Sequence, residues 1–80
     1  MEARKIIITG GATRIGAAIA KKLCGPNKEM LIHFNKSKSS AEKLKIFLEN
    51  KGTKVFLVKG DLSNEKDVSK IVKFAKKKLR

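Results

Sequence analysis

Three short runs of apolar residues stand out in an otherwise polar chain. They cover residues 5–9, 30–34 and 54–58, and each has the length of an ordinary strand. The runs are nearly continuous rather than alternating, which is typical of strands buried on both faces of a parallel sheet. We therefore predict three parallel strands.

Apolar residues recur at helical spacing between and after these runs. In the first such segment, one face carries Ile15, Ala18, Ile19 and Leu23. We expect this helix to end at Gly25, because a glycine followed by a proline stops a helix.

The second and third helical segments follow the same pattern. Their apolar faces carry, respectively, Ala41, Leu44, Phe47 and Leu48, and Val68, Ile71, Val72, Ala75 and Leu79. Ser39 and Glu42 have the spacing of a capping box, and Gly52 marks the end of the second helix. Ser63 or Asn64 is expected to cap the third.

The elements therefore alternate as β-α-β-α-β-α. This order predicts an α/β fold in which right-handed crossovers join the strands of a parallel sheet. The sequence contains no internal repeat, linker or low-complexity tract, so residues 1–80 are expected to form a single domain.

The chain is strongly basic. It carries 20 lysines and arginines against 7 acidic residues, a formal net charge of +13. Such a charge favours anionic partners, including nucleotides and nucleic acids. The lysines are spread along the whole chain, so a solvated lysine-rich surface without a polyanion partner is the alternative.

The single cysteine and the single histidine limit the kinds of site that this chain can form. Cys24 is the single cysteine, so no internal disulfide is predicted, and we expect it to pack in the core beside Leu23. One Cys and one His do not make a metal site, so no metal is predicted. The first apolar run is too short for a signal peptide or a membrane span, and we expect a cytoplasmic protein without a membrane partner.

The stretch "TGGATRIG", residues 9–16, lies between the first strand and the first helix. Backbone N–H groups and the positive helix end meet in such a turn, which suits a pyrophosphate. Gly10 would allow the tight turn, Gly11 and Ala12 would keep the loop free of bulk, and Gly16 would let the helix pack closely. The alternative is a purely structural turn.

The second strand ends in "HFNKSKSS", residues 33–40, which contains no acid. NAD-binding proteins usually place a carboxylate here for the ribose 2′-hydroxyl. Asn35, Lys36 and Ser37 instead offer donors and a positive charge, which fit a 2′-phosphate and predict NADP(H). Ordinary solvated loop lysines are the alternative. His33 lies inside an apolar strand, where we expect a packed, hydrogen-bonded histidine.

The third strand ends in "KGDLSN", residues 59–64. Asp61 would stand at the carboxyl edge of the sheet, where open α/β folds bind ligands. Its carboxylate can accept a hydrogen bond from an adenine amino group, with Leu62 against the ring. The alternative makes Asp61 part of the turn that leads into the third helix.

Together these three motifs resemble the amino-terminal part of the short-chain dehydrogenase/reductase family, over essentially the whole chain. Thr9, Gly10 and Gly16 match the family's loop pattern Thr-Gly-x-x-x-Gly-x-Gly, and Arg14 replaces its middle glycine. An arginine there, with a His-aromatic-x-basic-Ser run after the second strand, is similar to the pteridine reductase branch. The resemblance implies one half of a Rossmann-like doubly wound parallel sheet, with strand order 3-2-1.

The resemblance also implies roles for individual residues. Cofactor-binding positions carried over in this way are Thr9, Gly10, Arg14, Ile15, Gly16, Asn35, Lys36, Ser37, Asp61 and Leu62. Of these, Arg14, Lys36 and Ser37 would lie at phosphate, Ile15 would be a nonpolar loop contact, and Asp61 and Leu62 would lie at adenine.

The family's catalytic groups are absent from this sequence. Its members use a Tyr-x-x-x-Lys pair to supply the proton during hydride transfer, and these 80 residues contain no tyrosine. We therefore predict no catalytic residue here, only the NADP(H)-binding portion of a reductase that would act on a carbonyl or a pterin-like ring. The alternatives are a small basic module that binds nucleic acid or another polyanion, although no aromatic platform or zinc motif supports it, and an inert truncated remnant.

One physical consequence concerns the first strand. With strand order 3-2-1, residues 6–8 form an exposed apolar edge. Such edges invite pairing with another chain, so we expect the isolated chain to self-associate through this strand or to fold only in part.

Overall fold

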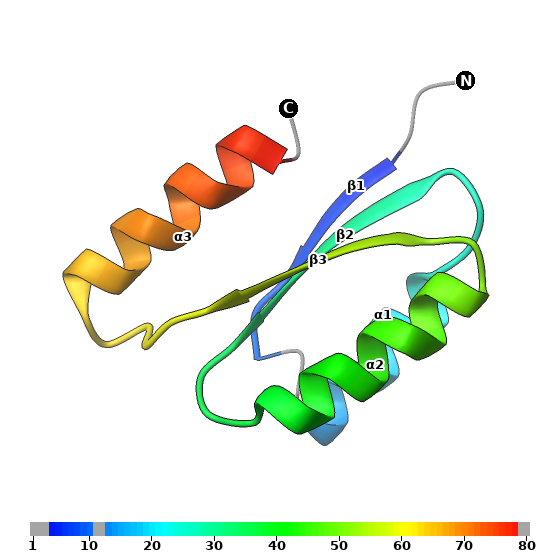
Figure 1. Cartoon of the computed structure of the whole chain (residues 1–80), viewed down its shortest axis with the longest axis horizontal. Helices are drawn as coiled ribbons and strands as arrows, with labels where there is room; N and C mark the ends of the chain where they lie inside the picture. The colour runs from blue at the N-terminus through cyan, green and yellow to red at the C-terminus, as the bar shows by residue number, and fades with distance from the viewer. Residues whose placement is uncertain (1–3, 11–12, 79–80) are drawn as a thin grey trace.

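Strands and helices alternate along the chain as the sequence predicts (Figure 1). A computed structural model describes residues 4–10 and 13–78. The elements are β1 (Arg4–Ile8), α1 (Arg14–Leu23), β2 (Lys28–Phe34), α2 (Lys38–Asn50), β3 (Lys54–Lys59) and α3 (Glu65–Lys78). The predictions made for Gly11, Ala12 and Leu79 lie outside the described residues.

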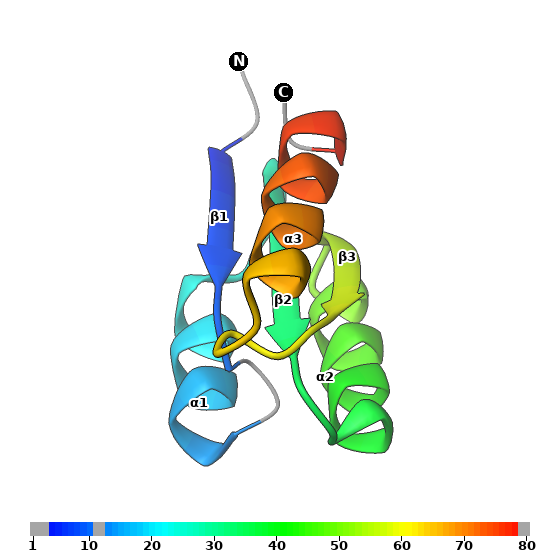
Figure 2. The same ribbon diagram turned by 90° about the vertical axis from the view of Figure 1, so that its left-hand side faces the viewer.

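The three strands form one parallel sheet in the order β1-β2-β3, which confirms the predicted topology. Ile7 lies beside Leu31 in the register, and Leu31 lies beside Phe56. Helices α1 and α2 cover one face of the sheet, and α3 lies on the opposite face (Figure 2). This arrangement leaves β1 with a single strand neighbour among the described residues.

The core follows the two faces of β2. Met30 and Ile32 point toward α1 and α2, where they join a cluster with Leu44 and Leu48. Leu31 points the other way, into a smaller cluster beneath α3. Because β2 is covered on both faces and paired on both edges, all the apolar side chains of its run are buried.

Helix α1 packs differently from the expectation. Its predicted apolar face is exposed, with Ile15 74%, Ile19 47% and Leu23 40% accessible. The side that contacts the core instead carries the small residues Gly16, Ala17 and Ala20, and Cys24 packs against the same cluster, as predicted. Small side chains let a helix backbone lie close to the sheet, which turns the bulky residues outward.

Two of the helix-end signals predicted for α2 and α3 are confirmed, and a third is wrong. Gly52, at φ 92, follows α2, and its N–H donates to the Glu49 carbonyl (3.0 Å). Asn64 caps α3 by accepting from the backbone of Lys66 (2.9 Å). The predicted Ser39–Glu42 capping box is wrong, because α2 begins at Lys38, one residue before Ser39, and has Ser37 at its N-cap position.

At the amino ends of the strands, the buried side chain of Thr53 links two turns. Thr53 Oγ1 accepts from the Gly25 N–H (2.8 Å) and donates to the Gly25 carbonyl (3.0 Å), which ties the turn before β2 to the turn before β3. Within the described residues, no helix is long and apolar enough to cross a bilayer. The same residues hold no group of three or more His, Cys, Asp or Glu side chains arranged to bind a metal ion.

Candidate functional site

The carboxyl ends of β1 and β2 meet around a hollow of about 340 Å³. Parallel strands end at the same edge of a sheet, and ligands of open α/β folds bind outside that edge. We call this site the strand-end hollow. It is lined by Gly10, Thr13, His33, Phe34, Asn35, Lys36 and Ser37.

His33, near the end of β2, links the loops that follow β1 and β3. Its side chain is 3% exposed. Nδ1 accepts a hydrogen bond from the Gly10 N–H after β1 (3.1 Å), and Nε2 lies 2.7 Å from the Gly60 carbonyl oxygen after β3. Since Nδ1 accepts, the ring proton belongs on Nε2, which donates to Gly60. The histidine is therefore packed and hydrogen-bonded, as predicted, and it positions the glycine loop.

Thr13 organises the start of α1. Its hydroxyl accepts from the Gly16 N–H (3.1 Å) and donates to the Gly10 carbonyl (2.7 Å). The amides of Gly10 and Gly16 are thus occupied within the protein. The first four N–H groups of a helix lack intrahelical partners, so those of Arg14 and Ile15, which have no partner among the described residues, are the ones that can meet a phosphate.

The loop between β2 and α2 supplies polar groups and a positive charge to the hollow. Asn35, Lys36 and Ser37 are all exposed there. Ser37 occupies the N-cap position, but its hydroxyl makes no capping hydrogen bond, so that hydroxyl remains available to a ligand. No carboxylate is among the described residues that line the hollow.

Arg14 lines a second site rather than the strand-end hollow. This site lies between α1 and α2, has a volume of about 330 Å³, and shares Thr13 with the hollow. We call it the α1–α2 groove. It is lined by Thr13, Arg14, Ala17, Lys21, Ser40, Lys43, Leu44 and Phe47.

Asp61 lies in the turn that leads into α3, which matches the structural alternative for this residue. Its Oδ1 accepts from the Ser63 hydroxyl (2.7 Å) and the Ser63 N–H (2.9 Å). These two hydrogen bonds, with a smaller contribution from the positive charge of Lys36, hold the pKa of the Asp61 carboxyl below its ordinary value. The Gly60 N–H donates to the Phe34 carbonyl (3.0 Å), so the loops after β2 and β3 begin side by side.

The structure thus brings together part of the predicted set. Gly10, Asn35, Lys36 and Ser37 share the strand-end hollow, and Arg14 lies in the adjoining groove. The four others with side chains line neither site: Thr9, Ile15, Asp61 and Leu62. Gly16 contributes as expected to close helix packing, since it is buried in α1.

Sequence reasoning missed Thr13 and the groove. Thr13 stands three residues before Gly16, and the N-cap preference of threonine could have identified it. Ser40 and Lys43 carried no comparable signal, because a lysine on a helix surface is ordinary in a chain this basic.

Comparison with known proteins decides the family. The family model for short chain dehydrogenases matches residues 4–80. The chain belongs to the short-chain dehydrogenase family. A curated short-chain dehydrogenase/reductase homologue from Bacillus subtilis (strain 168) is 27% identical to it over 66 residues, which are 82% of this chain and 61% of that protein.

Solved structures of short-chain dehydrogenases share its fold. One from Oenococcus oeni PSU-1 is 39% identical, with a TM-score of 0.82 over 95% of this chain and 35% of that one. L-sorbose reductase from Gluconobacter frateurii, solved in complex with NADPH and L-sorbose, has a TM-score of 0.78 at 22% identity, over 98% of this chain and 30% of the reductase. This short-chain dehydrogenase sequence therefore spans about a third of the length of these two proteins.

Proposed function

We propose that this chain binds NADP(H) at the carboxyl edge of its sheet, as the cofactor-binding portion (residues 1–80) of a short-chain dehydrogenase/reductase. The observation that carries the proposal is the strand-end hollow. It lies at the carboxyl ends of β1 and β2. Its lining includes Lys36 and Ser37, whose hydroxyl makes no capping hydrogen bond, and no carboxylate is among its described lining residues. A 2′-phosphate needs such donors and would be repelled by an acid.

The residues present fit the parts of a dinucleotide. The pyrophosphate would meet the Arg14 and Ile15 amides at the start of α1, where the helix dipole favours negative charge. The ribose would lie against Asn35, Lys36 and Ser37. Asp61 and Leu62, on the turn after β3, would contact the adenine. Thr9 and Gly10 would shape the loop. The L-sorbose reductase crystallised with NADPH supports this choice of cofactor.

The proposed reaction is hydride transfer from NADPH to a carbonyl or a pterin-like ring. Bound NADPH would supply the hydride, and the residues described here would bind and orient it. The 80 residues contain no tyrosine, so on this proposal the proton donor lies outside them. Arg14 together with the run from His33 to Ser37 supports the pteridine reductase branch. A cytoplasmic location is part of the proposal, and a single unpaired cysteine is in keeping with it.

We further propose that the free edge of β1 mediates self-association. Unpaired strand edges are templates for another strand, and Ile7 on this edge strand is 54% exposed. The net charge of +13 opposes the contact between two copies. Association should therefore strengthen as salt screens the repulsion.

Calorimetric titration of the purified chain with NADPH and NADH tests cofactor binding. We expect saturable binding of NADPH and weaker binding of NADH. Lys36→Glu should weaken NADPH binding by about tenfold or more, which is about 1.4 kcal/mol, and Arg14→Ala should weaken it as well. Lys54→Glu, at the amino end of β3, is the matched control and should leave both titrations unchanged.

A folded chain that binds neither dinucleotide would contradict the proposal and would make the glycine-rich loop a structural turn. Equal losses in Lys36→Glu and Lys54→Glu would also contradict it, because they would show a general effect of net charge.

A further inference from the structure

Helix α3 carries a row of lysines along its solvent side. Lys66, Lys70, Lys73 and Lys77 follow one another at spacings of four, three and four residues, and all of them are exposed. At 3.6 residues per turn these positions fall within an arc of about 60° and extend over roughly 16 Å of the helix. We call these four residues the α3 lysine row.

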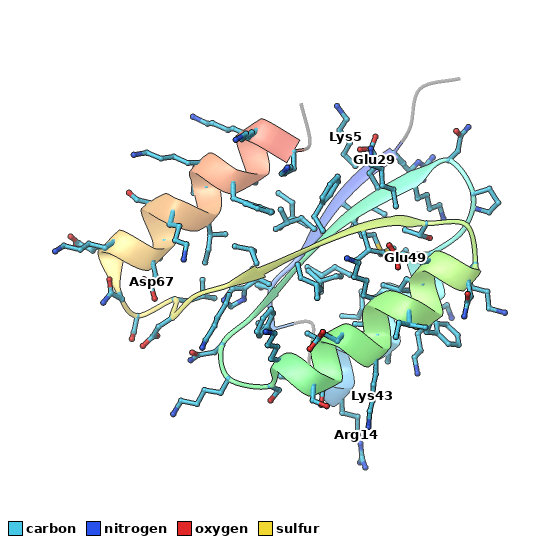
Figure 3. The ribbon with its side chains drawn as sticks, in the orientation of Figure 1. Lys5, Arg14, Glu29, Lys43, Glu49 and Asp67 are labelled. Carbon is cyan, nitrogen blue, oxygen red and sulfur yellow. The ribbon has the colours of Figure 1, made fainter. Side chains whose placement is uncertain are left out.

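The opposite side of α3 attaches the helix to the sheet. Ile71 is buried in the cluster that joins α3 to β2 and β3. Asp67 accepts a hydrogen bond at Oδ2 from the Asp61 N–H (2.8 Å), on the side of α3 that faces the turn after β3 (Figure 3). The α3 lysine row takes no part in these contacts.

The electrostatics of the helix accounts for the lysines of the last turn but not for the whole row. Lys76, Lys77 and Lys78 stand in the last turn, where the helix dipole favours positive charge. Lys66 stands in the first turn, where the dipole disfavours it, and like charges four residues apart, such as Lys66 and Lys70, destabilise a helix. The row therefore lowers the stability of α3 unless anions lie against it.

Helix α2 shows how this chain arranges charge on another helix surface. Lys45 follows Glu42 by three residues and precedes Glu49 by four, so opposite charges are neighbours on that helix. In α3 the acidic residues are confined to the first turn. The uninterrupted positive charge is thus a property of α3 rather than of every helix in this basic chain.

The row also borders a shallow hollow of about 570 Å³ on the surface of α3. Ser69 places a hydroxyl among the lysines, and Glu65, at the start of the helix, is the one acid among the described lining residues. The full lining is Glu65, Lys66, Ser69, Lys70 and Lys73. Ammonium groups around a hydroxyl suit the oxygen atoms of phosphate.

We infer that the α3 lysine row binds the phosphate backbone of double-stranded nucleic acid, without regard to base sequence. Duplex DNA carries one negative charge per about 1.7 Å of its axis, so a row roughly 16 Å long faces several phosphates. A single strand carries about half that charge density, which favours the duplex.

The residue types in the row explain why the binding would be independent of sequence. A lysine neutralises a phosphate as a point charge, and the row holds neither an arginine, which reads bases with its planar fork, nor an aromatic ring on which bases stack. The row lies on α3, across the sheet from α1 and α2 (Figure 2). The inference therefore does not depend on the proposed function.

The test measures binding of the chain to short fluorescein-labelled DNA duplexes by fluorescence anisotropy at several salt concentrations. The double variant Lys70→Ala, Lys73→Ala should weaken binding at low salt by about tenfold or more. It should also reduce the slope of log K against log salt concentration by about 1.8, because each phosphate contact contributes about 0.9. Two duplexes of unrelated sequence should bind equally well.

The matched control removes the same charge from the other side of the sheet. Lys22→Ala, Lys43→Ala changes two exposed lysines of α1 and α2, and Figure 3 shows Lys43 far from α3. This variant should keep the affinity for the duplex within about twofold. Alanine favours helix, so both double variants should retain the circular dichroism spectrum of the wild-type chain.

The expected result is a loss of duplex binding in Lys70→Ala, Lys73→Ala with NADPH binding unchanged. Equal losses in the two double variants would overturn the inference, because only net charge would then matter. Displacement of the duplex by an equimolar amount of NADPH would overturn it too, since the duplex would then occupy the cofactor site. Binding to phosphatidylserine vesicles but not to the duplex would assign the row to a membrane surface instead.

Discussion

β1 and β2 look alike in sequence but differ in burial. In β2, Met30, Leu31 and Ile32 are completely buried and Phe34 is 5% exposed. In β1, which also has an apolar run, Ile8 is buried but Ile7 is 54% exposed. β2 has a strand on each side while β1 pairs only with β2, and the cluster beneath α3 takes its strand side chains from β2 and β3, so the side chain of Ile7 is left uncovered. A continuous apolar run thus predicts a strand, but its burial depends on neighbours that the run does not specify.

The helices repeat this contrast. In α2 the apolar residues Ala41, Leu44 and Leu48 are buried against the sheet. In α1, which lies on the β1 side of the sheet, the large apolar side chains are exposed (Figure 2). Among the described residues β2 supplies four buried apolar side chains and β1 only one, although large apolar side chains are exposed on α2 and α3 as well. The predictions below test this contrast.

The largest effect is expected in the centre of the sheet. Ile32→Ala should lower the free energy of unfolding by about 2–5 kcal/mol, because it removes a fully buried side chain and leaves a cavity. Ile7→Ala, the matched change on β1, should lower it by less than about 1 kcal/mol. Urea denaturation followed by circular dichroism measures both. Equal losses would show that β1 is as well buried as β2.

The next effect concerns the link between the strand ends. His33→Phe keeps a ring of similar size but leaves the Gly10 N–H and the Gly60 carbonyl without their partner. The free energy of unfolding should fall by about 1–3 kcal/mol, the cost of an unsatisfied buried polar group. Hydrogen exchange of the Gly10 amide, measured by NMR, should accelerate.

Lys36→Ala is the control for that experiment, because Lys36 is exposed and only three residues away. It should leave the exchange rate of the Gly10 amide unchanged. If the Gly10 amide of His33→Phe exchanged at the same rate as in the wild-type chain, the histidine would not be what holds the loop.

The smallest effect on stability, but a clear one on assembly, is expected at the β1 edge. Ile7→Lys should leave the fold intact and abolish self-association, because a charge on an edge strand blocks pairing. Sedimentation equilibrium at low and high salt should show that wild-type association increases with salt while Ile7→Lys stays monomeric. A wild-type chain that remains monomeric at both salt concentrations would contradict the edge proposal.

Much of the fold could be predicted from the sequence because its signals are local. The apolar runs, the glycine after α2 and the cap at Asn64 depend on residues close together in the chain. Of the candidate site, the loop residues Gly10, Lys36 and Ser37 were predictable because they follow strands that end at one edge. The capping box at Ser39 failed because the chain enters α2 earlier, at Ser37.

The rest required the tertiary structure. By itself the sequence determined the order of strands and helices, the basic charge and the motifs after each strand, because periodicity and turn chemistry are properties of neighbouring residues. Only the folded structure decided that His33 links Gly10 to Gly60, residues 50 positions apart. It also decided that Arg14 and Lys43 share a groove, and that α1 turns its small residues inward. Each of these depends on how separate elements pack, and packing is set by the whole core rather than by any one segment.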